Sequence, residues 1–85
     1  MDGSIKELSI KFHDRLKTIV NAKIHCTIDE KEDKLYVVFN RLGLQYDTSI
    51  SNISSLLDGD EDKFERTLDI IVKRVRQYVD HKFFY

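Results

Sequence analysis

The segment that most constrains the fold is the last third of the chain, because it has the longest unbroken periodicity. Between positions 60 and 83, apolar residues recur at steps of four and three, at Phe64, Leu68, Ile71, Val75 and Tyr78. This spacing puts them on one face of an α-helix. Such a face must be covered by other parts of the molecule, so we expect the rest of the chain to pack against this helix.

Size and charge limit what else the chain can be. Its 85 residues suffice for one domain with a modest core, which we expect to span residues 1–85. Hydrophobic residues make up 41% and charged residues 34%, with 14 basic and 15 acidic side chains. This composition argues against disorder. The balanced charge also argues against a strongly basic nucleic-acid binder and against a uniformly acidic DNA mimic.

The sequence carries the features of a soluble cytoplasmic protein. Cys26 is the single cysteine, so no internal disulfide can form, whereas small secreted domains usually contain several. The first residues lack a basic region followed by an apolar run, and no segment approaches the ~18 apolar residues of a membrane span. We therefore predict no membrane partner and a cytoplasmic location.

A first helix is predicted over residues 5–20. Ser4 and Glu7 have the spacing of a capping box, and the apolar residues that follow share one helical face. Leu8, Ile10 and Phe12 alternate, which also allows a short strand. The length of the pattern and the cap favour the helix.

The middle of the chain predicts a three-stranded antiparallel meander. Ile24, Cys26 and Ile28 alternate with polar residues, as on a half-buried strand, and the acidic residues 29–33 form a loop. Residues 34–40 are apolar on both faces. Gly43 marks a tight turn before a weaker strand over residues 44–48. Connections this short exclude parallel crossovers.

Two further helices complete the predicted fold. Residues 50–57 have helical spacing, with Ser51 or Asn52 as the N-cap, and Gly59 ends this short helix. Asp60 begins the long helix and places negative charge at its N-terminus. The fold class is therefore α+β in the order α-β-β-β-α-α, with the helices on one face of the sheet and a long C-terminal helix.

No group of residues predicts catalysis, a metal or a cofactor. His13, His25 and His81 lie in different elements, and the neighbours His25 and Cys26 point to opposite faces of their strand. The chain lacks a nucleophile elbow and a Gly-rich phosphate loop. The acidic clusters at 29–33 and 58–62 do not have the ligand spacing of a calcium loop. They remain either turns and helix caps or contact surfaces.

Apolar residues outside the predicted core indicate an interface. Ile10 and Ile70 lie off the apolar faces of their helices, Tyr36 and Val38 point to the sheet face that the helices leave bare, and the chain ends in three aromatic residues. Alternatively, these last aromatics fold back onto the open sheet face and complete the core. The predicted partner or dimer interface contains Tyr36, Val38, Ile10, Ile70, Phe83, Phe84 and Tyr85.

Nucleic-acid binding is the alternative function. Helix, three antiparallel strands and helix is also the order of double-stranded-RNA-binding domains. Acidic residues occupy the loop 29–33 and positions 60–62, where that family places phosphate-binding residues. The resemblance therefore stops at topology. A nucleic acid would have to contact basic residues of the first and last helices, namely Lys11, Arg15, Lys73, Arg74 and Arg76.

Without catalytic residues, a small α+β protein of this kind is most economically a binding module. In the meander of residues 24–48 and the acid-capped helix from Asp60, the chain resembles small accessory and inhibitor proteins of phages of Gram-positive bacteria, including some anti-CRISPR proteins. The resemblance implies a viral protein that binds and blocks a host macromolecule. Its near-neutral charge differs from that of acidic DNA mimics. We expect a protein partner and a homodimer.

Overall fold

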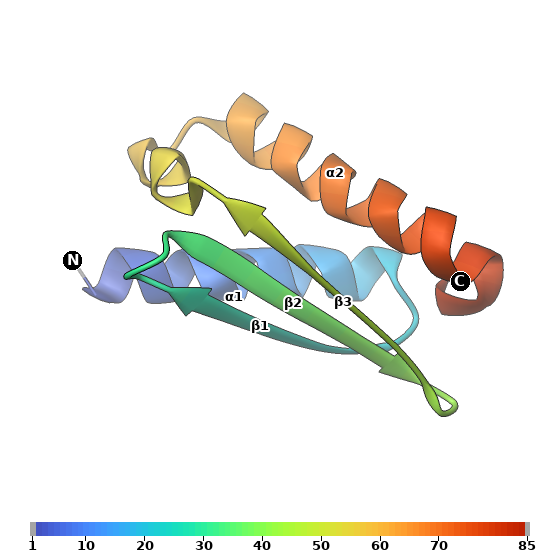
Figure 1. The fold of residues 1–85 in the computed structure, drawn as a ribbon. Coiled ribbons are helices and arrows are strands. Elements are labelled where there is room, and N and C mark those ends of the chain that lie inside the picture. Colours follow the sequence, from blue (N-terminus) through green and yellow to red (C-terminus); the bar gives the residue numbers. More distant parts are fainter. Residues whose placement is uncertain (1, 85) are drawn as a thin grey trace.

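The computed structural model describes residues 2–84 and has seven helical and strand elements. These are α1 (Asp2–Ile19), β1 (Lys23–Asp29), β2 (Lys34–Arg41), β3 (Leu44–Ser51), the 3₁₀ helix η1 (Ile53–Asp58), α2 (Glu61–Val79) and the 3₁₀ helix η2 (Asp80–Phe83). The strands form one antiparallel sheet in the order β1-β2-β3 (Figure 1). This arrangement confirms the predicted α+β fold with its long C-terminal helix.

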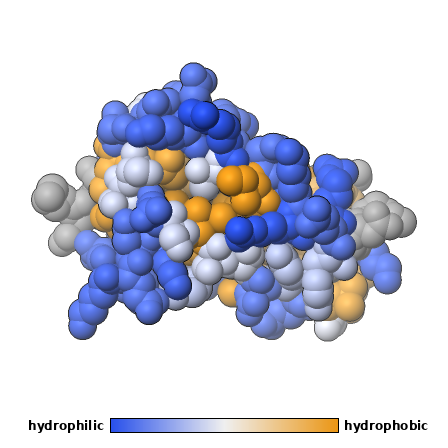
Figure 2. All heavy atoms as spheres, turned by 45° about the horizontal axis from the view of Figure 1, so that its top comes forward, coloured by the Kyte–Doolittle hydropathy of each residue, from blue (hydrophilic) through white to orange (hydrophobic). Residues whose placement is uncertain are grey.

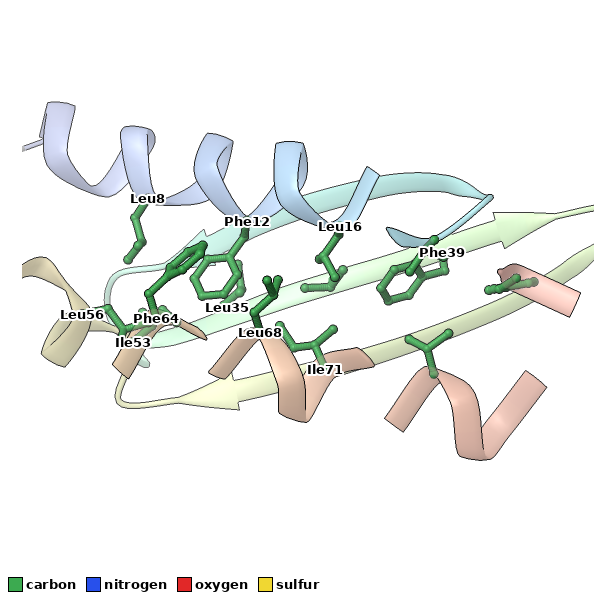
Figure 3. Close-up of a cluster of buried hydrophobic side chains, with 14 residues drawn as sticks. Leu8, Phe12, Leu16, Leu35, Phe39, Ile53, Leu56, Phe64, Leu68 and Ile71 are labelled. Carbon is green, nitrogen blue, oxygen red and sulfur yellow. The ribbon is translucent and has the colours of Figure 1, made fainter. Parts of the chain in front are cut away.

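The central strand β2 divides the sheet into two different faces. Leu35, Val37 and Phe39 are completely buried, whereas the alternating Tyr36 is exposed and Val38 is half-buried. The buried residues share one core with side chains from α1 and α2, which point toward them (Figure 3). The aromatic rings of Phe12 in α1 and Phe64 in α2 are 4.6 Å apart in this core. The helices therefore cover one face of the sheet.

The first helix begins earlier than predicted. It starts at Asp2, so Ser4 lies inside the helix and not at the predicted cap position. At its other end, the Val20 N–H still donates to the Leu16 carbonyl oxygen (2.7 Å), after which the chain enters the sheet. The apolar positions Leu8, Phe12 and Leu16, spaced four apart, are all buried. Their burial explains why this segment forms a helix rather than the alternative strand.

The short helix differs from the prediction at its start. Ile50 and Ser51 continue β3, and the helix that follows is a 3₁₀ helix beginning at Ile53. Asn52 adopts a left-handed conformation with φ 58° and its side chain makes no capping bond. The cap comes instead from Asp33, whose carboxylate accepts hydrogen bonds from the Ser54 N–H and hydroxyl, both at 2.8 Å. A residue of the acidic loop, distant in sequence, therefore replaces the predicted local cap.

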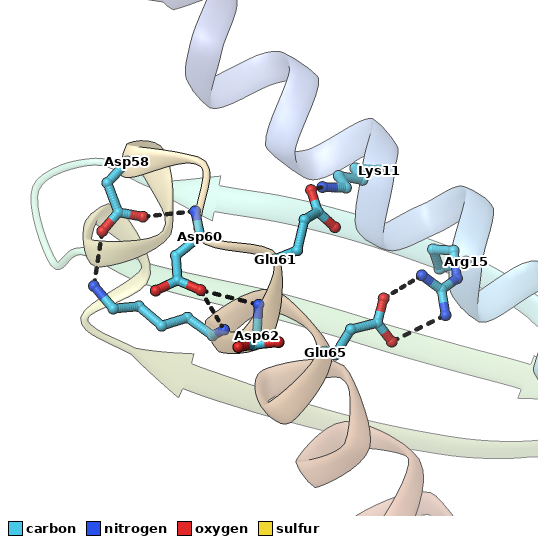
Figure 4. Close-up of polar contacts among 8 residues, drawn as sticks. Lys11, Arg15, Asp58, Asp60, Glu61, Asp62 and Glu65 are labelled. Atoms are coloured by element: carbon cyan, nitrogen blue, oxygen red, sulfur yellow. Dashed lines mark hydrogen bonds and ion pairs between the residues drawn. The ribbon is translucent and has the colours of Figure 1, made fainter.

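The long helix begins where the sequence predicts but ends sooner. The Asp60 carboxylate accepts from the N–H groups of Asp62 (2.9 Å) and Lys63 (3.3 Å), which is the geometry of an N-cap. Figure 4 shows this cap with the ion pair between Lys63 and Asp58 beside it. The α-helix ends at Val79, and η2 replaces its predicted last turn.

The C-terminal segment folds back against the start of the sheet. Phe83 is completely buried, with its ring 6.4 Å from that of Phe39 on the covered face. The Asn21 N–H donates to the Phe83 carbonyl oxygen (2.5 Å), and Phe84 forms a β-bridge with Val20. Phe83 thus completes the core, so its assignment to an interface is wrong. The predicted return to the open sheet face is also wrong for Phe83. Tyr85 lies outside the described residues.

Candidate protein-binding surface

The face of the sheet opposite the core, here called the open face, carries mainly polar side chains. Val38 lies between His25 of β1 and Asp47 of β3, and Tyr36 lies between Thr27 and Ser49. Tyr36 is 36% exposed and Val38 is half-buried. The predicted position of both apolar residues on this face is confirmed, whereas their role in binding stays a prediction.

Tyr36 is held in place by a hydrogen bond. Its hydroxyl donates to Glu32 Oε1 (2.6 Å), a residue of the loop before β2. This hydrogen bond, with smaller effects of partial desolvation and nearby negative charge, raises the pKa of Tyr36. The ring therefore stays a neutral phenol at physiological pH and offers a fixed aromatic surface beside Val38.

The structure does not bring all the predicted interface residues together. Ile10 is 49% exposed and lines a hollow of about 190 Å³ with Ile24 and Cys26, so it lies beside β1. Ile70 is 44% exposed but belongs to α2, which packs over β3. Phe84 is half-buried and contacts the guanidinium of Arg76 through its ring. Tyr36 and Val38 share the open face, whereas Ile10 lies on the helix-covered side of β1.

The exposed apolar residues are spread over several elements, and four of them were not predicted as interface residues, namely Leu42, Leu44, Leu57 and Tyr78. Figure 2 shows apolar surface gathered in the middle of one view, with hydrophilic residues around it. The hairpin residue Leu42 is 87% exposed, and Leu44 and Leu57 are each 41% exposed. A leucine directly before Gly43, in a turn where Asn or Asp is usual, is the sequence signal that could have revealed Leu42. The large exposed apolar residues are Ile10, Tyr36, Leu42, Leu44, Leu57, Ile70 and Tyr78.

The β3 edge of the sheet is covered by α2. Arg74 donates hydrogen bonds to Thr48 Oγ1 (2.9 Å) and to the Ser49 carbonyl oxygen (2.7 Å). Farther along the helix, the ring of Tyr78 lies 4.6 Å from that of Tyr46. Side chains of α2 therefore occupy the edge at which another strand could otherwise pair.

The turn between β2 and β3 determines which backbone groups point out of the sheet. Leu42 and Gly43 form a two-residue turn with φ angles of 52° and 82°, so the flanking residues Arg41 and Leu44 form a hydrogen-bonded pair. Because such pairs alternate along antiparallel strands, Tyr36 and Ser49 form a non-hydrogen-bonded pair. The bond from Arg74 to the Ser49 carbonyl agrees with this alternation, since that carbonyl must point outward.

The same alternation leaves the β1 edge open. The backbone groups of Tyr36 and Val38 point away from β3, so they bond with their β1 partners Thr27 and His25. The N–H and C=O groups of the intervening β1 residues must then point away from the sheet. Within residues 2–84, we find no hydrogen bond from another segment to these groups. They belong to Ile24, Cys26 and Ile28.

Three adjoining hollows run along α1, β1 and the tip of the β2–β3 hairpin, with volumes of about 190, 350 and 510 Å³. Lys17 and Lys23 line two of them, and Arg41 lines the largest. No carboxylate lines any of the three. In the described part of the chain, Lys17 and Lys23 also have no ion pair. Within the described residues, the positive charges of Lys17 and Lys23 at the start of β1 are therefore not neutralised by an ion pair.

The five basic residues of the nucleic-acid alternative are already engaged within the chain. Lys11 pairs with Glu61 at 2.5 Å and Arg15 pairs with Glu65, which joins α1 to α2 (Figure 4). Lys73 pairs with Asp69 one turn away, Arg74 bonds to β3, and Arg76 lies over the ring of Phe84. Phosphate groups would have to displace these contacts, so the structure adds no support to this alternative.

Cys26, His13 and His25 lie close together beside β1. Burial raises the pKa of Cys26 to about 11, so its thiol stays protonated and weakly nucleophilic at neutral pH. His13, His25 and Cys26 line the same hollow. In the region that the structure covers, however, no three potential ligands are placed to hold a metal ion. Neither described helix is long and apolar enough to cross a membrane.

Comparison with family profiles, with characterised proteins and with solved structures finds no match for this chain.

Proposed function

We propose that this protein is a non-catalytic protein-binding module whose open face is the contact surface. The proposal rests on the difference between the two faces of the sheet. Both helices cover one face, and the other face is bare, with Tyr36 and Val38 on its central strand. A protein partner would bury these two residues among the polar side chains around them.

The composition of the open face suits a protein partner. Tyr36 is a rigid aromatic residue with a polar tip, and such residues often contribute most to binding energy. His25, Asp47 and Thr27 surround the two apolar residues and can form hydrogen bonds at the rim of an interface. The patch is small, so a partner would have to extend beyond it along the sheet.

Two finer features belong to the same proposal. The module acts by occupying a surface of a host protein, as the resemblance to small phage inhibitors implies, and it works as a homodimer. The bare face supports the first feature because binding there needs no chemistry beyond contact. The open β1 edge supports the second.

The test is capture of proteins from a lysate of the native cells, with wild type compared with the double variant Tyr36→Ser, Val38→Lys. Ile70→Ser is the matched control, because Ile70 is exposed but lies on α2. We expect specific proteins to bind wild type and the control but not the double variant. Equal capture by all three would show that the open face is not the contact surface. Capture only of nucleic acid, weakening steeply with salt, would favour the alternative function.

A further inference from the structure

We propose that β1 pairs with the β1 strand of a second copy of this chain, which joins the two sheets into one continuous sheet. Another β-strand can satisfy the open edge, because the outward-pointing N–H donors and C=O acceptors alternate along it. Phosphates offer only acceptors and would leave the carbonyl groups without partners. This inference rests on the homodimer of the proposed function and assigns its interface, but it does not depend on what the open face binds.

The direction of the outward groups limits the possible registers, and the longest overlap selects one of them. In an antiparallel pair, outward-pointing residues must lie opposite outward-pointing residues to exchange hydrogen bonds. The register that overlaps all 7 residues of β1 meets this condition, because it puts Cys26 opposite Cys26 and Ile24 opposite Ile28 of the second copy. About six new backbone hydrogen bonds then form. A shift by one residue would place outward groups opposite inward ones and lose these bonds.

Charge complementarity identifies the second copy as the occupant. β1 has Lys23 at its start, near Lys17 and Arg41, and it has Asp29 at its end, followed by Glu30. The proposed register brings Lys23 opposite Asp29 of the second copy, and it does so twice because of the two-fold axis. The carboxylates absent from the hollows around Lys17 and Lys23 are thus supplied by the loop after β1 of the other copy.

The same arrangement accounts for the exposure of Ile10. A two-fold axis through the Cys26 pair stands perpendicular to the joined sheet, so both helix layers lie on the same side. Ile10 lines the hollow beside Cys26, and the two Ile10 side chains therefore come close to the axis. The open faces of both copies also become one surface, with Tyr36 and Val38 present twice.

The experiment measures mass by sedimentation equilibrium over a range of concentrations. The key variant is Cys26→Pro, which removes an outward N–H and places a ring at the edge without breaking a β1–β2 hydrogen bond. Asp47→Pro is the matched control, because its backbone groups point outward from the β3 edge. We expect wild type and Asp47→Pro to form dimers and Cys26→Pro to remain a single chain.

Charge variants provide a test that does not depend on how well proline is tolerated. Lys23→Glu should weaken dimerisation on the order of tenfold, since like charges then lie opposite each other twice. Adding Asp29→Lys should restore it, with circular dichroism checking the fold because the Asp29 carboxylate also binds the turn N–H groups of Lys31 and Glu32. At a pH high enough to ionise part of the Cys26 thiol, an added oxidant should link the wild-type dimer through Cys26, because a hydrogen-bonded pair sets the Cα atoms about 5.5 Å apart.

Three results would overturn the proposal. The first is a wild type that stays a single chain up to ~1 mM, the limit of weak association. The second is a dimer that both Cys26→Pro and Lys23→Glu leave intact. The third is a monomer whose β1 edge is occupied only when a different protein is added, which would assign the edge to that partner.

Discussion

The two edges of the sheet differ in whether another part of the chain covers them. At β3, Arg74 of α2 binds the outward Ser49 carbonyl oxygen, so a helix blocks the addition of another strand. At β1, no described segment reaches the outward groups of Ile24, Cys26 and Ile28. Uncovered edges invite pairing, and small proteins usually protect them. If the sheet associates through an edge, as proposed above, this difference confines the association to β1.

The region around α2 and the region at the start of β1 also differ in how their charged side chains are paired. Around α2, the positive side chains have partners within the chain, including the pairs of Arg15 with Glu65 and Lys63 with Asp58. Around the start of β1, Lys17 and Lys23 line hollows that contain no carboxylate. Several cations around α2 therefore have partners within the chain, whereas in the proposed dimer Lys17 and Lys23 obtain theirs from the second copy.

The largest effect on stability is expected for Phe83→Ala. This variant tests how strongly the C-terminal segment stabilises the start of β1. The buried ring packs against Phe39, so its removal should destabilise the fold by about 3–5 kcal/mol. Urea unfolding of Phe83→Ala measures this loss. Tyr78→Ala is the control, because its ring is 63% exposed and should cost under about 1 kcal/mol. Equal losses in both variants would contradict the burial of Phe83.

The next prediction concerns the β3 edge, which Arg74 of α2 covers. Arg74→Ala removes two hydrogen bonds to β3 and exposes the Ser49 carbonyl, so it should cost about 1 kcal/mol of stability. It should also allow association beyond dimers, because both edges are then free. Sedimentation velocity measures the larger species. Lys73→Ala is the control, since Lys73 pairs only with its neighbour Asp69. Arg74→Ala without larger species would show that other features protect the β3 edge.

A smaller effect, in the stabilising direction, is expected at the turn that sets the register. Leu42 has φ 52°, a left-handed conformation that Asn adopts more readily than leucine. Leu42→Asn should therefore stabilise the protein by about 0.5–1 kcal/mol, measured by urea unfolding. Leu44→Asn, in the adjoining strand, should show no such gain. A loss of stability in Leu42→Asn would mean that the exposed leucine makes contacts that the turn requires.

The smallest effect concerns the ion pairs between the helices. The hydrogen bond from Arg15 lowers the pKa of Glu65, so the charged carboxylate favours the folded state. A lowered folded-state pKa gives stability that is present above the unfolded pKa and is lost as pH falls through the folded value. The difference in melting temperature between wild type and Glu65→Gln should therefore be small at pH 7 and shrink further as the pH falls below the unfolded-state pKa of about 4.3. A difference that persists in acid would exclude the ion pair as its cause.

The order of helices and strands could be predicted from the sequence, because periodicity, capping and charge indicated the same type of element in most segments. Asp60 is an example, since its side chain and the following acidic residues all favour a helix start. The short helix at 50–57 was misplaced because its cap, Asp33, lies far away in sequence. Phe83 was misassigned because an aromatic residue near the chain end has the same pattern whether it packs inward or outward.

The candidate site was predictable only in part. The alternation in β2 correctly placed Tyr36 and Val38 on the bare face, because period two follows directly from strand geometry. The open β1 edge could not be predicted, since it depends on the pairing register and on which edge α2 covers. The contacts of Arg74 with β3, which close the other edge, join residues 25 and 26 positions apart.

The most direct test of the unequal edges is amide hydrogen exchange of β1, measured by NMR at low and high protein concentration. The N–H groups of His25 and Thr27 should be protected at both concentrations, because they bond to β2. The N–H groups of Ile24, Cys26 and Ile28 should exchange rapidly in dilute protein and become protected as the dimer forms. Protection of these three groups that does not change with concentration would contradict the open edge and the dimer built on it.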